Sequence, residues 1–270
     1  MNNSKLSNFP RIYIIALLCV MYLPIALVII FSFNQSRLSV EWTGFTLDWY
    51  RQLFRDRSMG EALRNSLFLA TISSFAAAVI GTLGAFGATR HKLRGSGAVE
   101  YVSMLPIMIP EIILGMVLLA FFSLLGLPMG MTTLIIAHTS FNIPYVFLLV
   151  KARLSGLSKD YSEAARDLGA GEARVFFDII LPLIFPAILS GMLLGFAMSF
   201  DDVIISVLVT GPQVSLLPIK IYTQVKTGIT PKTNALCTLL FAATVVLGLL
   251  SAWLARAPRG KKQEARGKKL

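Results

Sequence analysis

Three carboxylates, Glu111, Asp201 and Asp202, stand in stretches of sequence that are otherwise almost entirely apolar. A charged side chain at the centre of a bilayer costs at least about 2.5 kcal/mol, so it persists only with a partner or a task. A few carboxylates along an apolar route suit a cation, because they replace part of its hydration shell. A structural interpretation also exists: Glu111 follows Pro110 as a first-turn acid of a broken helix, and the aspartates can cap or pair.

Aromatic and polar side chains occur close to these carboxylates. Asn142 lies four residues after His138, Tyr145 follows about one turn later, and Phe200 precedes Asp201. Aromatic faces attract cations, whereas a buried, hydrogen-bonded patch is the alternative for His138 and Asn142. His138 has no companion His or Cys at ligand spacing, which disfavours a metal site. The predicted substrate-path residues are Glu111, Asp201, Asp202, Tyr145, Asn142 and Phe200.

The elements that must position these side chains are membrane-spanning helices. Of the 270 residues, 55% are hydrophobic and 14% are charged, whereas a soluble domain carries about 25% charged residues. The apolar runs are continuous and do not alternate, which favours helices over a barrel. Cys19 and Cys237 both lie in apolar runs, so neither a disulfide framework nor a zinc site is expected.

The sequence predicts an all-α polytopic membrane protein with six transmembrane helices. A cleaved signal peptide is the alternative for the first span, but that apolar run is long and no small-residue cleavage site follows it. The predicted spans are Ile12–Phe33, Leu67–Ala88, Val99–Leu119, Thr132–Val150, Leu183–Val209 and Ala235–Ala255.

Loop charges set the expected orientation. One side of the predicted membrane domain carries roughly twice as many Lys and Arg residues as the other, and the positive-inside bias makes that side cytoplasmic. Residues 1–11 are then a cytoplasmic N-terminus, residues 12–255 the six-span membrane domain, and residues 256–270 a basic cytoplasmic tail. A solvated, lipid-facing anchor explains this tail, and nucleic acid is not needed to account for the net charge of +11.

The segment between the first two spans lies outside in this orientation. Its aromatic-rich part, Trp42–Phe54, is typical of an interfacial helix on the outer leaflet, because Trp and Tyr favour headgroup depth. Contact with an external partner is the alternative interpretation of this segment.

A polar island, Glu163–Pro182, interrupts the apolar sequence within a hairpin of about residues 155–182. It is too polar to cross a bilayer, so it is expected in the cytoplasm, with a surface open to a soluble partner. Ser162 is the candidate N-cap of its first helix, and Gly169 breaks that helix before a second one begins. A solvated loop without a partner is the alternative.

The spacing within the island is specific. Glu163-Ala-Ala, Gly169 six residues after Glu163, then Ile179 and Leu181-Pro182, resembles the EAA signature of permease subunits in bacterial ABC importers, and every fixed position is met. In that family the hairpin is a coupling helix seated on a cytoplasmic ATPase. The resemblance implies an ATPase-coupling role for Glu163, Ala164, Ala165, Gly169, Ile179, Leu181 and Pro182.

The resemblance extends over nearly the whole chain and is strongest to polyamine (spermidine/putrescine) permease subunits. Segments that carry it include Tyr22–Arg37, Met198–Pro212 and Leu217–Leu236. It implies a non-catalytic subunit of the bacterial inner membrane, which works with a second permease subunit, an ATPase dimer and an external solute-binding protein. No GxxxxGK[ST] run is present, so ATP and magnesium are expected on the partner ATPase.

Other functions remain open at this stage. Phosphate, sulfate, molybdate and ferric permeases share the signature; an oxyanion path favours cationic lining, whereas iron also uses carboxylates. A secondary transporter needs an ion-binding constellation and usually an internal repeat, and neither is evident. A channel, for which no filter-like loop is apparent, and a purely structural assembly subunit are the remaining alternatives.

Overall fold

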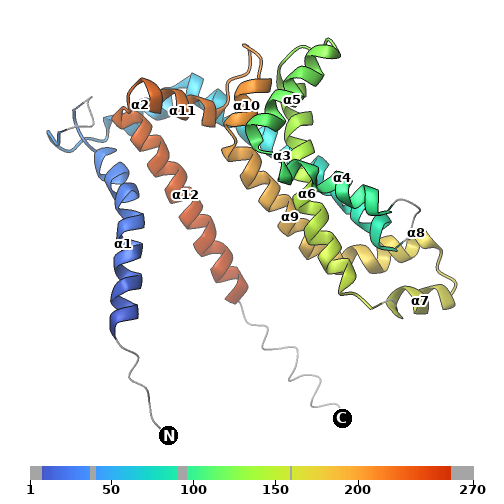
Figure 1. The fold of residues 1–270 in the computed structure, drawn as a ribbon. Coiled ribbons are helices and arrows are strands. Elements are labelled where there is room, and N and C mark those ends of the chain that lie inside the picture. Colours follow the sequence, from blue (N-terminus) through green and yellow to red (C-terminus); the bar gives the residue numbers. More distant parts are fainter. Residues whose placement is uncertain (1–7, 37–40, 91–95, 159, 257–270) are drawn as a thin grey trace, which may run out of the picture. The chain divides into compact units, whose positions relative to one another are not determined.

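The computed structural model describes residues 8–36, 41–90, 96–158 and 160–256 as a set of helices (Figure 1). Among these residues, β pairing is limited to an isolated bridge between Asn34 and Phe45. The predicted basic tail lies outside the described residues apart from Arg256. In chain order the elements are α1 (Asn8–Phe31), α2 (Asp48–Arg55), α3 (Arg57–Arg90), α4 (Ser96–Met108), α5 (Glu111–Leu124), α6 (Met131–Ser155), α7 (Asp160–Asp167), α8 (Glu172–Arg174), the π-helix η1 (Val175–Ile180), α9 (Leu181–Asp201), α10 (Ile204–Val209), α11 (Leu217–Thr227) and α12 (Pro231–Arg256).

The described part of the chain contains four helices that are long and apolar enough to cross a bilayer, and the bent pair α4–α5 passes the same test as one unit. The four are Pro10–Phe31, Arg57–Thr89, Met131–Ser155 and Glu172–Asp201. The sixth predicted span lies within α12, which has 26 residues. The protein is therefore an all-α, multi-pass membrane protein.

The chain divides into two compact units, and residues 1–57 and 224–270 form the first. In this unit α1 and α12 run antiparallel (Figure 1). The Lys232 ammonium lies 2.5 Å from the carboxylate of Asp56, which joins α12 to the end of α2. Apolar side chains of α1 such as Ile12 and Val20 are mostly exposed, as lipid-facing residues are.

The predicted interfacial helix at Trp42–Phe54 is wrong in its first half, because α2 begins only at Asp48. The preceding residues fold back on Asn34, whose buried side chain accepts a hydrogen bond from Thr43 N at 3.0 Å and donates one to Glu41 O at 2.6 Å. Trp49 Nε1 also donates to Asn34 O, at 2.7 Å. These bonds hold the segment in a loop.

Residues 58–223 form the second unit, in which α3, α6 and α9 pack closely. Small residues allow this approach. A Cβ added at Gly81 of α3 would lie 2.9 Å from Val146 Cβ, and one at Gly191 of α9 would lie 2.9 Å from Val146 Cα. Val146 of α6 is thus enclosed between two glycines, and these helices form a rigid frame for the site.

The third predicted span is broken. The axes of α4 and α5 differ by 113°. Pro110 has no N–H to continue the helix and disfavours helical geometry in the residue before it. Its carbonyl instead accepts hydrogen bonds from Ile113 N and Leu114 N, at 2.9 and 3.0 Å, so that Glu111 opens α5.

The fifth predicted span has different limits from those expected. Its helix begins at Glu172, upstream of Leu183, and ends at Asp201, well before Val209. Asp201 and Asp202 are therefore at the end of the span, whereas the predicted span continued through them to Val209. Asp202 has extended backbone (φ −65°, ψ 126°), and α10 follows as a separate short helix.

Candidate functional site

The break after Asp201 opens a cleft of about 430 Å³ within the second unit. Residues of α4, α5, α6, α9, α10 and the α9–α10 break surround it, so it gathers side chains from distant parts of the chain. Its lining residues are Pro106, Glu111, Leu114, Phe141, Tyr145, Ala197, Met198, Asp201, Asp202, Val203, Ile204 and Ile205.

The cleft brings together the three carboxylates singled out in the sequence, Glu111, Asp201 and Asp202, together with Tyr145. Phe200 is not among its lining residues and instead stacks on Phe196, with the ring centroids 6.0 Å apart. The structure therefore collects most, but not all, of the predicted path residues in one place.

Asn142 is also outside the cleft lining. It is fully buried against Gly195 of α9, where an added Cβ would lie 3.2 Å from Asn142 Cγ. Neither Nδ2 nor Oδ1 of Asn142 has a hydrogen-bond partner among the described residues. The hydrogen-bonded patch that the sequence suggested for His138 and Asn142 therefore includes only His138.

The charge of the cleft is negative. Glu111 and Asp201 are exposed, and neither forms an ion pair within the described part of the chain. The side chain of Asp202 is only 6% exposed. Two open carboxylates beside apolar and aromatic walls favour a positively charged ligand.

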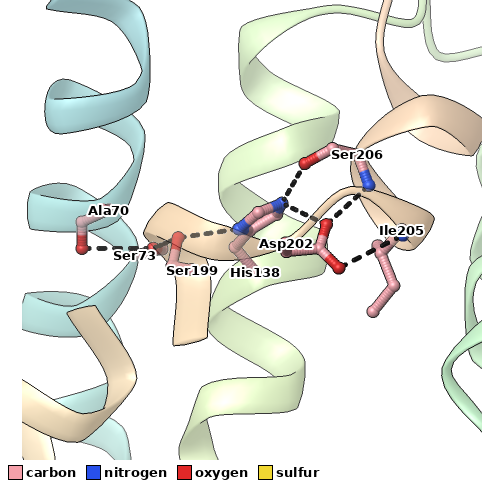
Figure 2. Close-up of polar contacts among 7 residues, drawn as sticks. All are labelled: Ala70, Ser73, His138, Ser199, Asp202, Ile205 and Ser206. Atoms are coloured by element: carbon pink, nitrogen blue, oxygen red, sulfur yellow. Dashed lines mark hydrogen bonds and ion pairs between the residues drawn. The ribbon is translucent and has the colours of Figure 1, made fainter. Parts of the chain in front are cut away.

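Asp202 has a structural task as well. Its Oδ1 accepts a hydrogen bond from Ile205 N at 3.3 Å, and its Oδ2 accepts one from Ser206 N at 2.7 Å (Figure 2). These two N–H groups belong to the first turn of α10, where backbone N–H groups have no acceptor within the helix. Asp202 therefore caps α10 while it lines the cleft.

His138 of α6 lies behind Asp202 and is fully buried (Figure 2). Its Nε2 is 3.1 Å from Ser206 Oγ and 3.5 Å from Asp202 Oδ2, and its Nδ1 is 2.7 Å from Ser199 Oγ. Ser199 Oγ in turn lies 3.1 Å from Ser73 Oγ of α3. The resulting network connects four helices.

The three serines of this network are not among the site residues predicted from the sequence. A signal for two of them was present, because Ser199 precedes Asp202 by three residues and Ser206 follows it by four. Such spacing places hydroxyls within reach of one site along a helix. Ser73 belongs to a distant helix, and no local pattern marks it.

The polar island has the predicted helix–turn–helix arrangement. Gly169 N donates to Arg166 O at 2.8 Å and Ala170 N donates to Ala165 O at 3.0 Å, the two bonds of a Schellman motif. Gly169 has φ +83°, a conformation that L-residues rarely adopt. Ser162 is not the N-cap that was expected, because it lies within α7 and is buried.

The signature residues divide between two faces. Glu163, Ala164 and Gly169 are exposed. Ala165 is buried and Ile179 packs against the same core cluster. Pro182 is exposed, and Leu181 packs against that cluster. One part of the signature therefore packs the hairpin against the helix frame, and the other part is exposed.

An ion pair closes the hairpin. Arg166 Nε lies 2.7 Å from one oxygen of Glu172 and Arg166 Nη2 lies 3.0 Å from the other. This hydrogen-bonded pairing raises the pKa of Arg166. Beyond Glu172 the chain continues through η1 into α9, so the second arm of the hairpin is the start of the long helix that ends at the cleft.

The hairpin and the cleft are separated by the length of that helix. The run Glu172–Asp201 contains 30 residues, and at 1.5 Å per residue it spans about 45 Å. A bilayer core is about 30 Å thick. The exposed hairpin and the acidic cleft thus lie at opposite ends of one membrane-length element.

This arrangement agrees with a family match. Residues 77–259 match the family described as "Binding-protein-dependent transport system inner membrane component". The chain belongs to this family. Members are permease subunits of ABC transporters, and the multi-pass helices are those of an inner-membrane protein.

Two relatives in Escherichia coli (strain K12) cover most of the chain. The "Spermidine/putrescine transport system permease protein PotC" is 39% identical over 90% of this chain and 92% of its own. The "Putrescine transport system permease protein PotI" is 38% identical over 98% of this chain and 97% of its own.

A solved structure shows the same fold. A chain from the crystal structure of a bacterial ABC transporter involved in the import of the acidic polysaccharide alginate has a TM-score of 0.70 to this protein. It matches 95% of this chain and 99% of its own, at 14% sequence identity. At that identity the likeness concerns the fold alone.

Proposed function

We propose that this chain is the permease subunit through which an ATP-driven importer moves polyamines, such as spermidine and putrescine, across the bacterial inner membrane. The names of its relatives support this substrate class. The observation that carries the proposal is the cleft, where Glu111 and Asp201 are open, acidic and without a basic partner among the described residues.

Polyamines are flexible chains of ammonium groups joined by methylenes. Carboxylates replace the hydration of the ammonium groups, and the aromatic and aliphatic walls accept the methylene segments; Tyr145 and Phe141 also offer faces for cation–π contact. An oxyanion in the same cleft would meet like charge. The sign of the cleft therefore favours a cation over phosphate, sulfate or molybdate.

We propose that ATP hydrolysis acts on the hairpin, at the end of the long helix that is opposite the cleft. In this proposal a partner ATPase dimer, which binds ATP and magnesium, contacts Glu163, Ala164 and Gly169 on the cytoplasmic side. Ala165, Ile179 and Leu181 transmit its closure to the helix frame against which they pack. A second permease subunit completes the path, and an external solute-binding protein delivers the polyamine.

The experiment is ATP-driven uptake of labelled spermidine and putrescine by the complete transporter in proteoliposomes. Asp201→Asn and Glu111→Gln are each expected to lower polyamine uptake by at least about tenfold, because each removes a charge-assisted contact worth about 1.5–3 kcal/mol. Complex assembly should not change, since both side chains are exposed and form no ion pair within the described residues.

Glu61→Gln is a matched control, because Glu61 is an exposed glutamate of α3 that does not line the cleft. Normal uptake is expected for this variant. If Asp201→Asn and Glu111→Gln also transport polyamines normally, the cleft carboxylates do not carry the cargo. If the unmodified transporter moves a different solute and no polyamine, the substrate assignment is wrong.

A further inference from the structure

The imidazole of His138 lies 3.5 Å from the carboxylate of Asp202, a residue that lines the cleft. We infer that His138 is a positioning residue that holds the Asp202 carboxylate in place at the α9–α10 break. This inference rests on the proposed function, in which the cation binds in the cleft that Asp202 lines. His138 itself is not among the lining residues of the cleft, so it acts through Asp202.

The Asp202 carboxylate has contacts with two elements. The backbone N–H groups of Ile205 and Ser206 in α10, a helix of only six residues, donate hydrogen bonds to it. On α6, which packs against α9, the ring of His138 lies 3.5 Å from Asp202 Oδ2. The contact with His138 therefore connects the Asp202 carboxylate to a long helix of the frame.

The hydrogen bonds favour one proton arrangement of the ring. When the proton is on Nε2, this nitrogen directs its N–H at Ser206 Oγ and at the nearby carboxylate oxygen of Asp202. Nδ1 then accepts the hydroxyl proton of Ser199. Ser199 Oγ then accepts the hydroxyl proton of Ser73, for which the carbonyl oxygen of Ala70, 3.4 Å from Ser73 Oγ, is the competing acceptor. The other tautomer sets the Nε2 lone pair against a carboxylate oxygen, which is repulsive.

Two amide substitutions separate the two sides of the ring. The Gln side chain places its amide nitrogen near the position of Nε2, whereas the Asn side chain reaches only the position of Nδ1. His138→Gln therefore keeps a donor toward Asp202, and His138→Asn keeps only the contact with Ser199. His138→Gln is expected to retain at least half of the polyamine uptake, and His138→Asn to lose about tenfold.

A double-mutant cycle tests whether the effect passes through Asp202. In an Asp202→Asn background, the further change His138→Asn should cause little additional loss of uptake. If His138 only packs α6 against α9, its replacement acts independently of Asp202 and the two losses multiply. That result overturns the inference.

A second measurement on the same variants, thermal unfolding, does not depend on the transported solute. The thermal unfolding midpoint of the detergent-purified transporter should fall by about 3 °C with either His138→Asn or Asp202→Asn, and by scarcely more in the double variant. Additive shifts contradict the link between the two residues. If the unmodified transporter moves no polyamine while the thermal shifts are non-additive, the proposed function fails but the link between His138 and Asp202 stands.

Discussion

Asp201 and Asp202 are neighbours in the sequence with different surroundings. Asp202 is largely buried and its carboxylate caps α10, whereas Asp201 is exposed at the end of α9 and makes no ion pair within the described residues. A loss of transport after substitution of Asp202 alone therefore mixes a structural effect with an effect on the cation. Asp201 gives the cleaner test of the cargo.

The two aspartates are expected to differ in stability when each is changed to alanine. Asp202→Ala removes a helix cap, which costs about 1 kcal/mol and lowers the thermal unfolding midpoint of the purified complex by about 2–4 °C. Asp201→Ala should shift the midpoint by less than 1 °C, within the range of surface substitutions. Equal shifts for the two variants would contradict the capping role.

At the scale of elements, the helical hairpin has Glu163 and the Gly169 turn exposed on its surface. Gly169→Val should prevent this turn, because a β-branched residue at φ +83° is strongly strained. We expect ATPase co-purification and polyamine uptake to fall at least fivefold.

Gly171→Val is the matched control for this substitution. Gly171 lies in the same turn and has φ −71°, and no atom lies within 4 Å of an added Cβ at either glycine. A valine fits the backbone conformation of Gly171 but not that of Gly169, so the control should keep most of the uptake. Glu163→Lys, which reverses an exposed charge without strain, should weaken ATPase association to a similar extent. Normal association in both Gly169→Val and Glu163→Lys would remove the coupling role of the hairpin.

The sequence predicts the hairpin and the break in the third span well, because both depend on local chemistry. Gly169 marks the turn, and Pro110 ends helical geometry without help from distant residues. The break after Asp201 was not foreseen, since no proline or glycine occurs between Phe196 and Thr210. Only the side-chain cap at Asp202 marks it; capping was one interpretation of the aspartates, but the predicted span Leu183–Val209 continues through them.

Long-range contacts set the other limit on prediction from the sequence. Ser73 and Ser199 are 126 residues apart, and their contact follows from the close approach of three helices at Gly81, Val146 and Gly191. Likewise, the burial of Asn142 against Gly195 depends on how α6 and α9 meet. The sequence identified the polar residues, but the packing decided which of them share a network.

At the scale of the whole molecule, the proposed contact with an ATPase requires that the hairpin lies on the cytoplasmic side of the membrane. A single cysteine introduced at Ser158 should react with a membrane-impermeant maleimide only after the cytoplasmic face is exposed. One introduced at Ser58 should react from outside in intact cells, as expected from the bias of Lys and Arg residues. Both positions are exposed in the structure. Labelling of Ser158→Cys from outside would reverse the orientation and exclude the proposed ATPase contact.

The central claim, that the acidic cleft carries a polyamine, is tested most directly by photo-crosslinking. A spermidine analogue with a diazirine group is supplied through the binding protein to the complete transporter, which is then arrested in its ATP-bound state, irradiated and mapped by mass spectrometry. If the polyamine passes through the cleft, adducts form in the segments that contain Glu111 and Asp201, and they disappear when excess spermidine competes. Adducts confined to other segments, or unaffected by spermidine, would contradict this claim.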